Sequence, residues 1–131
     1  MKIRCLEDRD FPQLVNIHRE FYKDEFIFPE LKDPKWLSKF VVTDEFDNVV
    51  VFGGNKILLE AIAITDKRRS VRERREALYK LLQAELFCCS VYNFDQLHAF
   101  IQDPVWAAHL KKNGFRACKG SALVIDAMGR D

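Results

Sequence analysis

Three short runs rich in β-forming residues follow one another between residues 40 and 65, with only a few turn-forming residues between them. They are Phe40–Thr43, Val49–Phe52 and Ile57–Thr65. Asp47-Asn48 separates the first run from the second, and Gly53-Gly54-Asn55 separates the second from the third. Connections this short join antiparallel neighbours, because parallel strands need a much longer crossover. The sequence therefore predicts an antiparallel meander in which Ile57–Thr65 is long enough to be a central strand.

Strands and helices alternate on both sides of this meander. Lys2–Cys5 is predicted to be a short strand, and Asp10 can cap the helix that follows, with Pro12 in its first turn. A second short helix is predicted to begin at Asp33-Pro34 and to carry Trp36. After the meander we predict a helix carrying Leu78, Leu81, Leu82 and Leu86, a strand at Leu97–Ile101, a helix from Asp103-Pro104 to Gly114, and a closing hairpin of Phe115–Cys118 and Ala122–Ile125.

This order of elements, β-α-α-β-β-β-α-β-α-β-β, fits one domain of 131 residues. A meander followed by a β-α-β crossover produces a mixed, mostly antiparallel central sheet with helices on both faces. We therefore predict a single domain of the α/β (α+β) class over residues 1–131.

Composition narrows the classes of function. The net charge is only +1, so no general attraction to nucleic acid or to an anionic membrane follows. The apolar runs are too short to span a bilayer, and the charged first residues contain no signal-peptide core. Neither the three histidines nor the four cysteines have the spacing of a metal site. We predict a soluble, cytoplasmic chain that binds no metal.

The segment Asp103–Phe115 reads Asp-Pro-Val-Trp-Ala-Ala-His-Leu-Lys-Lys-Asn-Gly-Phe. With the order of elements, it resembles the GNAT superfamily of N-acetyltransferases, whose last helix usually reads Asn-x-x-Ala-x-x-Leu-Tyr-x-x-x-Gly-Phe. Asp103 stands where Asn is usual, and Gly114-Phe115 align at the right distance. Lys2–Phe21, a strand followed by an acidic cap and an amphipathic helix, is also similar to the family. The brevity of the chain resembles the short acetyltransferase-like proteins of tailed bacteriophages, some of which are virion-associated.

This resemblance implies acetyl-CoA as cofactor, with its pyrophosphate on a loop that reads Gln/Arg-x-x-Gly-x-Gly/Ala in active relatives. Counting back from Leu78 places Ser70, Glu73 and Arg75 at the three motif positions, so both glycines are missing. The resemblance also places Ile62 and Ile64 of the predicted central strand, and Asp103 at the start of the last helix, along the cofactor.

A dense basic segment occupies the same stretch and offers another way to hold phosphate. Arginine side chains bind phosphate through two parallel hydrogen bonds, and the cations also oppose the helix dipole, which makes an added anion favourable. Two interpretations stay open: a side-chain phosphate site, or a solvated basic patch that an acidic partner or nearby Glu73 and Glu76 neutralise. The six cations are Lys67, Arg68, Arg69, Arg72, Arg74 and Arg75, and Arg72, Arg74 and Arg75 are the candidate phosphate ligands.

Two residues are candidates for the acid–base chemistry of acetyl transfer. Glu60 has the same alternation parity as Leu58 and Ile62, and a carboxylate on an apolar face is tuned toward a general base unless it reaches water or an Arg. The tyrosine acid of relatives falls at Leu110, which cannot donate a proton. His109 is adjacent, but its side chain points about 100° away along a helix.

Two hypotheses for function follow. The first is an acetyl-CoA-dependent N-acetyltransferase acting on an unknown amine, with loop Lys23–Lys32 lining the acceptor side. The alternative is a catalytically inactive GNAT-fold protein that serves as a structural or partner-binding module, within a virion if the chain is encoded by a phage. Trp106 replaces the small Ala of the family pattern and can fill part of the cofactor groove. Nucleic-acid binding ranks last, because Lys67–Arg75 lacks interleaved aromatic residues. The oligomeric state is left open.

Overall fold

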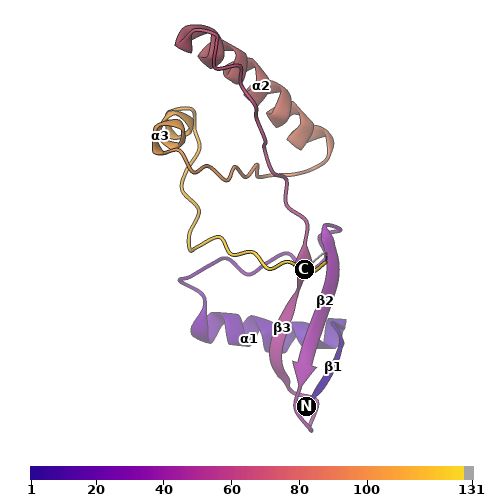
Figure 1. The fold of residues 1–131 in the computed structure, drawn as a ribbon. Helices are drawn as coiled ribbons and strands as arrows, with labels where there is room; N and C mark the ends of the chain where they lie inside the picture. The colour runs from indigo at the N-terminus through magenta and orange to yellow at the C-terminus, as the bar shows by residue number, and fades with distance from the viewer. Residues whose placement is uncertain (129–131) are drawn as a thin grey trace. The chain divides into compact units, whose positions relative to one another are not determined.

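A computed structural model describes residues 1–128 of the chain (Figure 1). The described part combines α and β structure and divides into two compact units, Met1–His98 and a second that begins at Ala99. The one-domain prediction for residues 1–131 stays a prediction. In chain order the elements are β1 (Lys2–Cys5), the short 3-10 helix η1 (Asp8–Asp10), α1 (Phe11–Phe21), β2 (Trp36–Thr43), β3 (Val49–Lys56), α2 (Val71–Val91) and α3 (Pro104–Lys112).

The three strands form one antiparallel sheet in the order β1-β2-β3. Arg4 lies opposite Val41, and Val41 lies opposite Phe52, so these residues share one face of the sheet. Val41 on this face is completely buried, together with Leu14 of α1. The core therefore forms between α1 and one face of the sheet, completed by Leu31 and Val49 and by the partly buried side chains of Leu6, Phe11, Ile17, Phe28, Trp36 and Phe52.

A charged network joins β1, the start of α1 and the β2–β3 turn. The Arg4 guanidinium donates to both carboxylate oxygens of Asp10, each at 2.7 Å, and through Nε to Asp47 at 3.2 Å. The backbone N–H of Glu7 also donates to Asp10, at 2.9 Å. Asp10 precedes α1 as predicted, but its side chain does not cap the helix, because the carboxylate is already engaged. The hydrogen bonds from Arg4 lower the pKa of Asp10, and burial opposes that shift only in part.

The helix predicted to begin at Asp33-Pro34 is wrong, because Trp36 opens strand β2. Asp33 forms a local turn instead, in which its carboxylate accepts the N–H of Lys35 at 3.0 Å. The Trp36 ring packs edge-on against Phe52 of β3, and its Nε1–H donates to the carbonyl of Glu30 at 3.0 Å. The cross-strand ring contact and the hydrogen bond to the preceding loop stabilise extended backbone where the Asp-Pro pair alone favours a helix start.

Gly53 and Gly54 do not form the predicted turn, because β3 continues through both of them to Lys56. Gly53 pairs with Phe40 and Gly54 with Lys39 of β2. A Cβ added to Gly54 would lie 2.0 Å from the carbonyl oxygen of Ser38, whereas one added to Gly53 would have nothing within 4 Å. Gly54 is therefore required by a close approach of two strand backbones.

The predicted strands at Ile57–Thr65 and Leu97–Ile101 are not formed as strands in the described structure. They meet at one isolated parallel bridge between Glu60 and His98. There the N–H of Ala61 donates to the His98 carbonyl at 2.7 Å, and the His98 N–H donates to the Leu59 carbonyl at 2.9 Å. The mixed sheet is thus reduced to a three-stranded antiparallel sheet and one parallel contact.

The predicted start and end of the helix from Asp103 to Gly114 are confirmed, whereas the closing hairpin is not. Asp103 caps α3 by accepting the N–H of Val105 at 2.9 Å. Ser70 caps α2, a role not predicted from the sequence. Gly114 follows α3 with a φ of 99°, a left-handed conformation that favours glycine. The residues predicted to form the hairpin, 115–118 and 122–125, are irregular. In the described part of the chain, no helix has the length and apolar character needed to cross a bilayer.

The two glycines of β3 make a matched test of the strand register. We expect Gly54→Ala to lower the free energy of unfolding by about 2 kcal/mol or more, because the β2–β3 backbones must separate to admit the methyl group. Gly53→Ala should change it by less than about 1 kcal/mol in either direction, because the added methyl meets no atom. Urea unfolding followed by circular dichroism measures both variants. Equal losses in the two would contradict the close approach at Ser38.

The Arg4–Asp10 pair should make folding sensitive to acid. Because the pKa of Asp10 is lowered from its ordinary value of 3.8, its contribution to stability is complete above that value and is lost as the pH falls through the lower folded value. We expect Asp10→Asn to cost about 2 kcal/mol at pH 7, since it removes charged hydrogen bonds at a buried site. Urea unfolding of the wild type and the variant at pH 7 and at pH 3 measures this difference. The gap between them should narrow at pH 3, and a gap that does not change would show that Asp10 contributes only by its shape.

Candidate functional site

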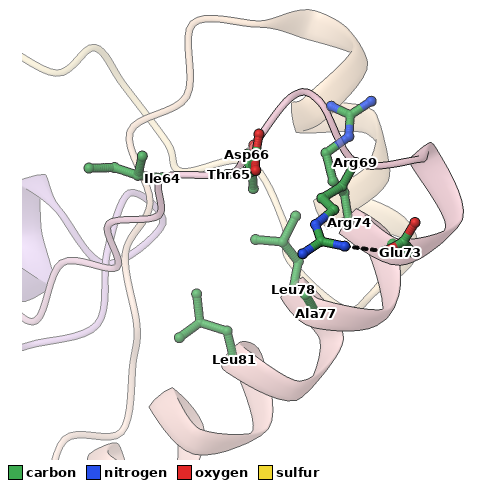
Figure 2. Close-up of a pocket in the computed structure, with 9 residues that line it drawn as sticks. All are labelled: Ile64, Thr65, Asp66, Arg69, Glu73, Arg74, Ala77, Leu78 and Leu81. Atoms are coloured by element: carbon green, nitrogen blue, oxygen red, sulfur yellow. Dashed lines mark hydrogen bonds and ion pairs between the residues drawn. The ribbon is translucent and has the colours of Figure 1, made fainter.

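A pocket of about 290 Å³ lies between the segment Ile64–Asp66 and the first turns of α2 (Figure 2). Both sides of the pocket come from one continuous stretch of chain, because the segment runs directly into the turn that precedes the helix. The apolar side consists of Ala77, Leu78 and Leu81, and the polar side consists of Thr65, Asp66, Arg69, Glu73 and Arg74. The pocket therefore combines an apolar floor with a charged rim, in which two arginines face two carboxylates.

The N-terminus of α2 is already partly satisfied by side chains. The Ser70 Oγ accepts the N–H of Glu73 at 3.1 Å and donates to the Glu73 carboxylate at 3.1 Å. This carboxylate supplies negative charge to the helix N-terminus. The N-terminus of α2 is therefore organised by a Ser–Glu pair.

Ion pairs engage both carboxylates of the pocket and leave Arg74 without an ionic partner among the described residues. Asp66 accepts from Arg68 at 3.0 Å, and this hydrogen bond lowers the pKa of Asp66. Arg69 pairs with Glu73 at 3.4 Å. Arg74 forms no ion pair with any residue between 1 and 128, and its Nε is buried without a hydrogen-bond partner. A buried N–H that donates to nothing is costly, so an acceptor entering the pocket would be stabilised by Arg74.

The structure separates the predicted cofactor residues into two groups. Ile64 and Arg74 line the pocket, and Ser70 caps the helix beside it. Arg72 and Arg75 are exposed on α2 and do not line the pocket, and Ile62 is exposed outside it. Asp103 belongs to the second unit, where its carboxylate caps α3. Only one of the three candidate phosphate ligands therefore lies in the pocket.

The two predicted catalytic residues lie in ordinary surroundings. Glu60 is exposed at the parallel bridge and does not sit on a buried apolar face. His109 lies in the second unit, where its ring stacks on Trp106 with the ring planes 6° apart and the centroids 5.4 Å apart. This stacking orders the surface of α3 and gives His109 no acidic or basic partner.

His98, opposite Glu60, was not among the predicted site residues, yet its Nδ1 is buried without a hydrogen-bond partner. A second cavity, of about 370 Å³, lies between α1, the residues that follow it and β3. This cavity could not be predicted from the sequence, because its walls come from segments that are far apart along the chain. Its one visible signal was the cluster of aromatic residues Phe21, Tyr22, Phe26 and Phe28.

Within residues 1–128, no group of three or more His, Cys, Asp or Glu side chains is placed to hold a metal ion. Comparison of the chain with protein-family models, with curated proteins and with solved structures produced no match.

Proposed function

We propose that the chain is a GNAT-type protein that binds acetyl-CoA and transfers its acetyl group to an amine. The observation that carries the proposal is the pocket at the N-terminus of α2, in which Arg74 has a buried, unpartnered N–H. This pocket lies at the point in the order of elements where the resemblance to GNAT proteins implies the pyrophosphate site.

Arg74 can take over the role that glycine N–H groups have in relatives. A guanidinium binds two phosphate oxygens at once, so its geometry suits a pyrophosphate as well as the backbone does. The neighbouring cations add to the positive potential at the pocket, because Lys67, Arg72 and Arg75 form no ion pair with a described residue. The apolar floor of Leu78 and Leu81 suits the uncharged part of such a ligand.

The parallel bridge between Glu60 and His98 also supports the proposal. The resemblance to GNAT proteins implies that Ile57–Thr65 and Leu97–Ile101 correspond to the two strands that splay apart around the cofactor. These two segments run parallel and touch at a single bridge, as strands that diverge from one point would.

When bound, acetyl-CoA supplies a thioester carbonyl that is open to attack by an amine. Glu60 is the candidate base for that amine, because its exposed carboxylate can accept a proton directly or through water. Leu110 cannot protonate the leaving thiolate, so water is the proton donor in this proposal. A thiolate can leave without a dedicated acid, although more slowly than with one.

A second candidate function is a GNAT-fold module that binds a partner protein without catalysis. The specific observation in its favour is the exposed apolar surface toward the end of α2, formed by Leu86, Phe87 and Val91. Exposed apolar side chains in a group mark interaction surfaces. The Ser70–Glu73 pair favours the same alternative, because Glu73 places a carboxylate where phosphate would approach.

The test is calorimetric titration with acetyl-CoA and with CoA at low and moderate salt, in the wild type and in two variants. We expect Arg74→Ala to weaken binding about tenfold or more, because a charged hydrogen bond to phosphate contributes roughly 1.5–3 kcal/mol. Arg72→Ala is the matched control: it removes the same charge from the same helix but outside the pocket, and should weaken binding less than about threefold.

Equal losses of affinity in the two variants would show that only the overall positive charge of the helix start contributes. Arg74 would then not be a direct phosphate ligand. No binding at all by the folded wild type would overturn the acetyltransferase proposal and leave the partner-binding alternative.

A further inference from the structure

We propose that the cavity between α1 and β3 binds a small organic cation with an apolar body, such as a quaternary ammonium group, through the faces of its aromatic rings. This proposal does not depend on acetyl-CoA binding. The residues that line the cavity are Leu14, Ile17, His18, Tyr22, Phe26, Phe28, Pro29, Val50, Val51 and Phe52.

Aromatic rings that pack against one another form part of the wall of this cavity, which is open to solvent at Tyr22 and Phe26, exposed by 40% and 50%. His18 meets Phe26 and Phe28 edge-on, at centroid distances of 5.2 Å and 5.5 Å, and Tyr22 lies 5.3 Å from Phe26. The interplanar angles of 64° and 75° at His18 turn the ring faces in different directions. Ring faces carry the negative part of the aromatic quadrupole, so each ring face that a bound cation contacts attracts it.

Hydrogen bonds hold the rings in place before any ligand arrives. The His18 Nε2–H donates to the carbonyl of Phe26 at 2.6 Å, which ties the loop after α1 back to the helix. The N–H groups of Glu25 and Phe26 both donate to the Tyr22 carbonyl, at 3.0 Å and 3.2 Å. A site whose side chains are already ordered loses less entropy when it binds.

Charge favours a cation over a neutral or anionic ligand. None of the ten lining residues is a Lys, Arg, Asp or Glu, so no fixed cation repels the ligand. The loop from Tyr22 to Leu31 carries Asp24, Glu25 and Glu30 against the single Lys23. Asp24 and Glu25 form no ion pair with any described residue, so their field is not cancelled locally. No carboxylate lines the cavity, so nothing there compensates ammonium for the loss of its strong hydration. A quaternary ammonium group is more weakly hydrated and should therefore bind better than ammonium.

The experiment compares choline with its neutral carbon isostere, 3,3-dimethylbutan-1-ol, which has the same shape without the charge. Binding to the whole chain is followed by chemical-shift changes in the aromatic and methyl resonances of the cavity residues. We expect choline to bind about two- to fivefold more tightly than the alcohol, because a cation–π contact at a partly exposed site contributes about 0.5–1 kcal/mol. The shift changes should map to Tyr22, Phe26 and Phe28.

Phe26→Leu removes a ring while keeping an apolar side chain, and Phe26 is half exposed, so the fold should survive. This variant should show a clearly smaller preference for choline over the alcohol than the wild type, because the other lining rings remain. Phe46→Leu is the matched control, because Phe46 is 77% exposed in the β2–β3 turn and outside the cavity, and it should keep the preference for choline. Tyr22→Leu repeats the test if Phe26→Leu does not fold.

Three results would overturn the proposal: equal binding of choline and the alcohol by the wild type, an unchanged preference in Phe26→Leu or Tyr22→Leu, or no saturable choline binding. The second result, with shifts that map elsewhere, would place the cation on the acidic surface instead of among the rings.

Discussion

The Arg4 guanidinium holds together three parts of the sheet unit that would otherwise be separate. Through Asp10 it joins β1 to the beginning of α1, and through Asp47 it reaches the β2–β3 turn. Asp47 has a left-handed φ of 63° and also pairs with Arg9 at 2.7 Å, so the turn conformation depends on the same charges. The Asp10 carboxylate is almost completely buried, and a buried carboxylate is tolerated only because its partners replace water. The position of α1 over the sheet, and with it the aromatic cavity, follows from this joint.

Local signals were sufficient wherever one short segment determines its own structure. The strand Lys2–Cys5 and the beginning of the helix after Asp10 could be predicted, because a proline and a spacing of apolar residues act within a few positions. Trp36 and Gly54 could not be placed correctly, because their conformations depend on the facing strand, through the Phe52 ring and the Ser38 carbonyl. The run Ile57–Thr65 has the composition of a strand, but composition does not supply the neighbour with which it must pair.

The candidate site shows the same division. The basic start of the helix could be read from the sequence, and so could the presence of Ile64 and Arg74 in a shared site. Which of the arginines lining the pocket remains unpaired could not be read from the sequence, because this depends on Asp66 and Glu73 each engaging a different neighbour. The aromatic cavity escaped prediction because α1 and β3 contribute to it together, and nothing local in either segment indicates the other.

The most direct measurement of the central claim, that phosphate binds at the start of α2, is hydrogen exchange followed by mass spectrometry with and without saturating CoA. Binding to Arg74 should slow exchange at backbone amides between residues 64 and 81, which form both sides of the pocket, because a bound ligand suppresses local opening. The β2–β3 ladder should exchange at the same rate in both samples. Unchanged exchange between residues 64 and 81 while CoA is bound, or protection confined to another part of the chain, would contradict the account.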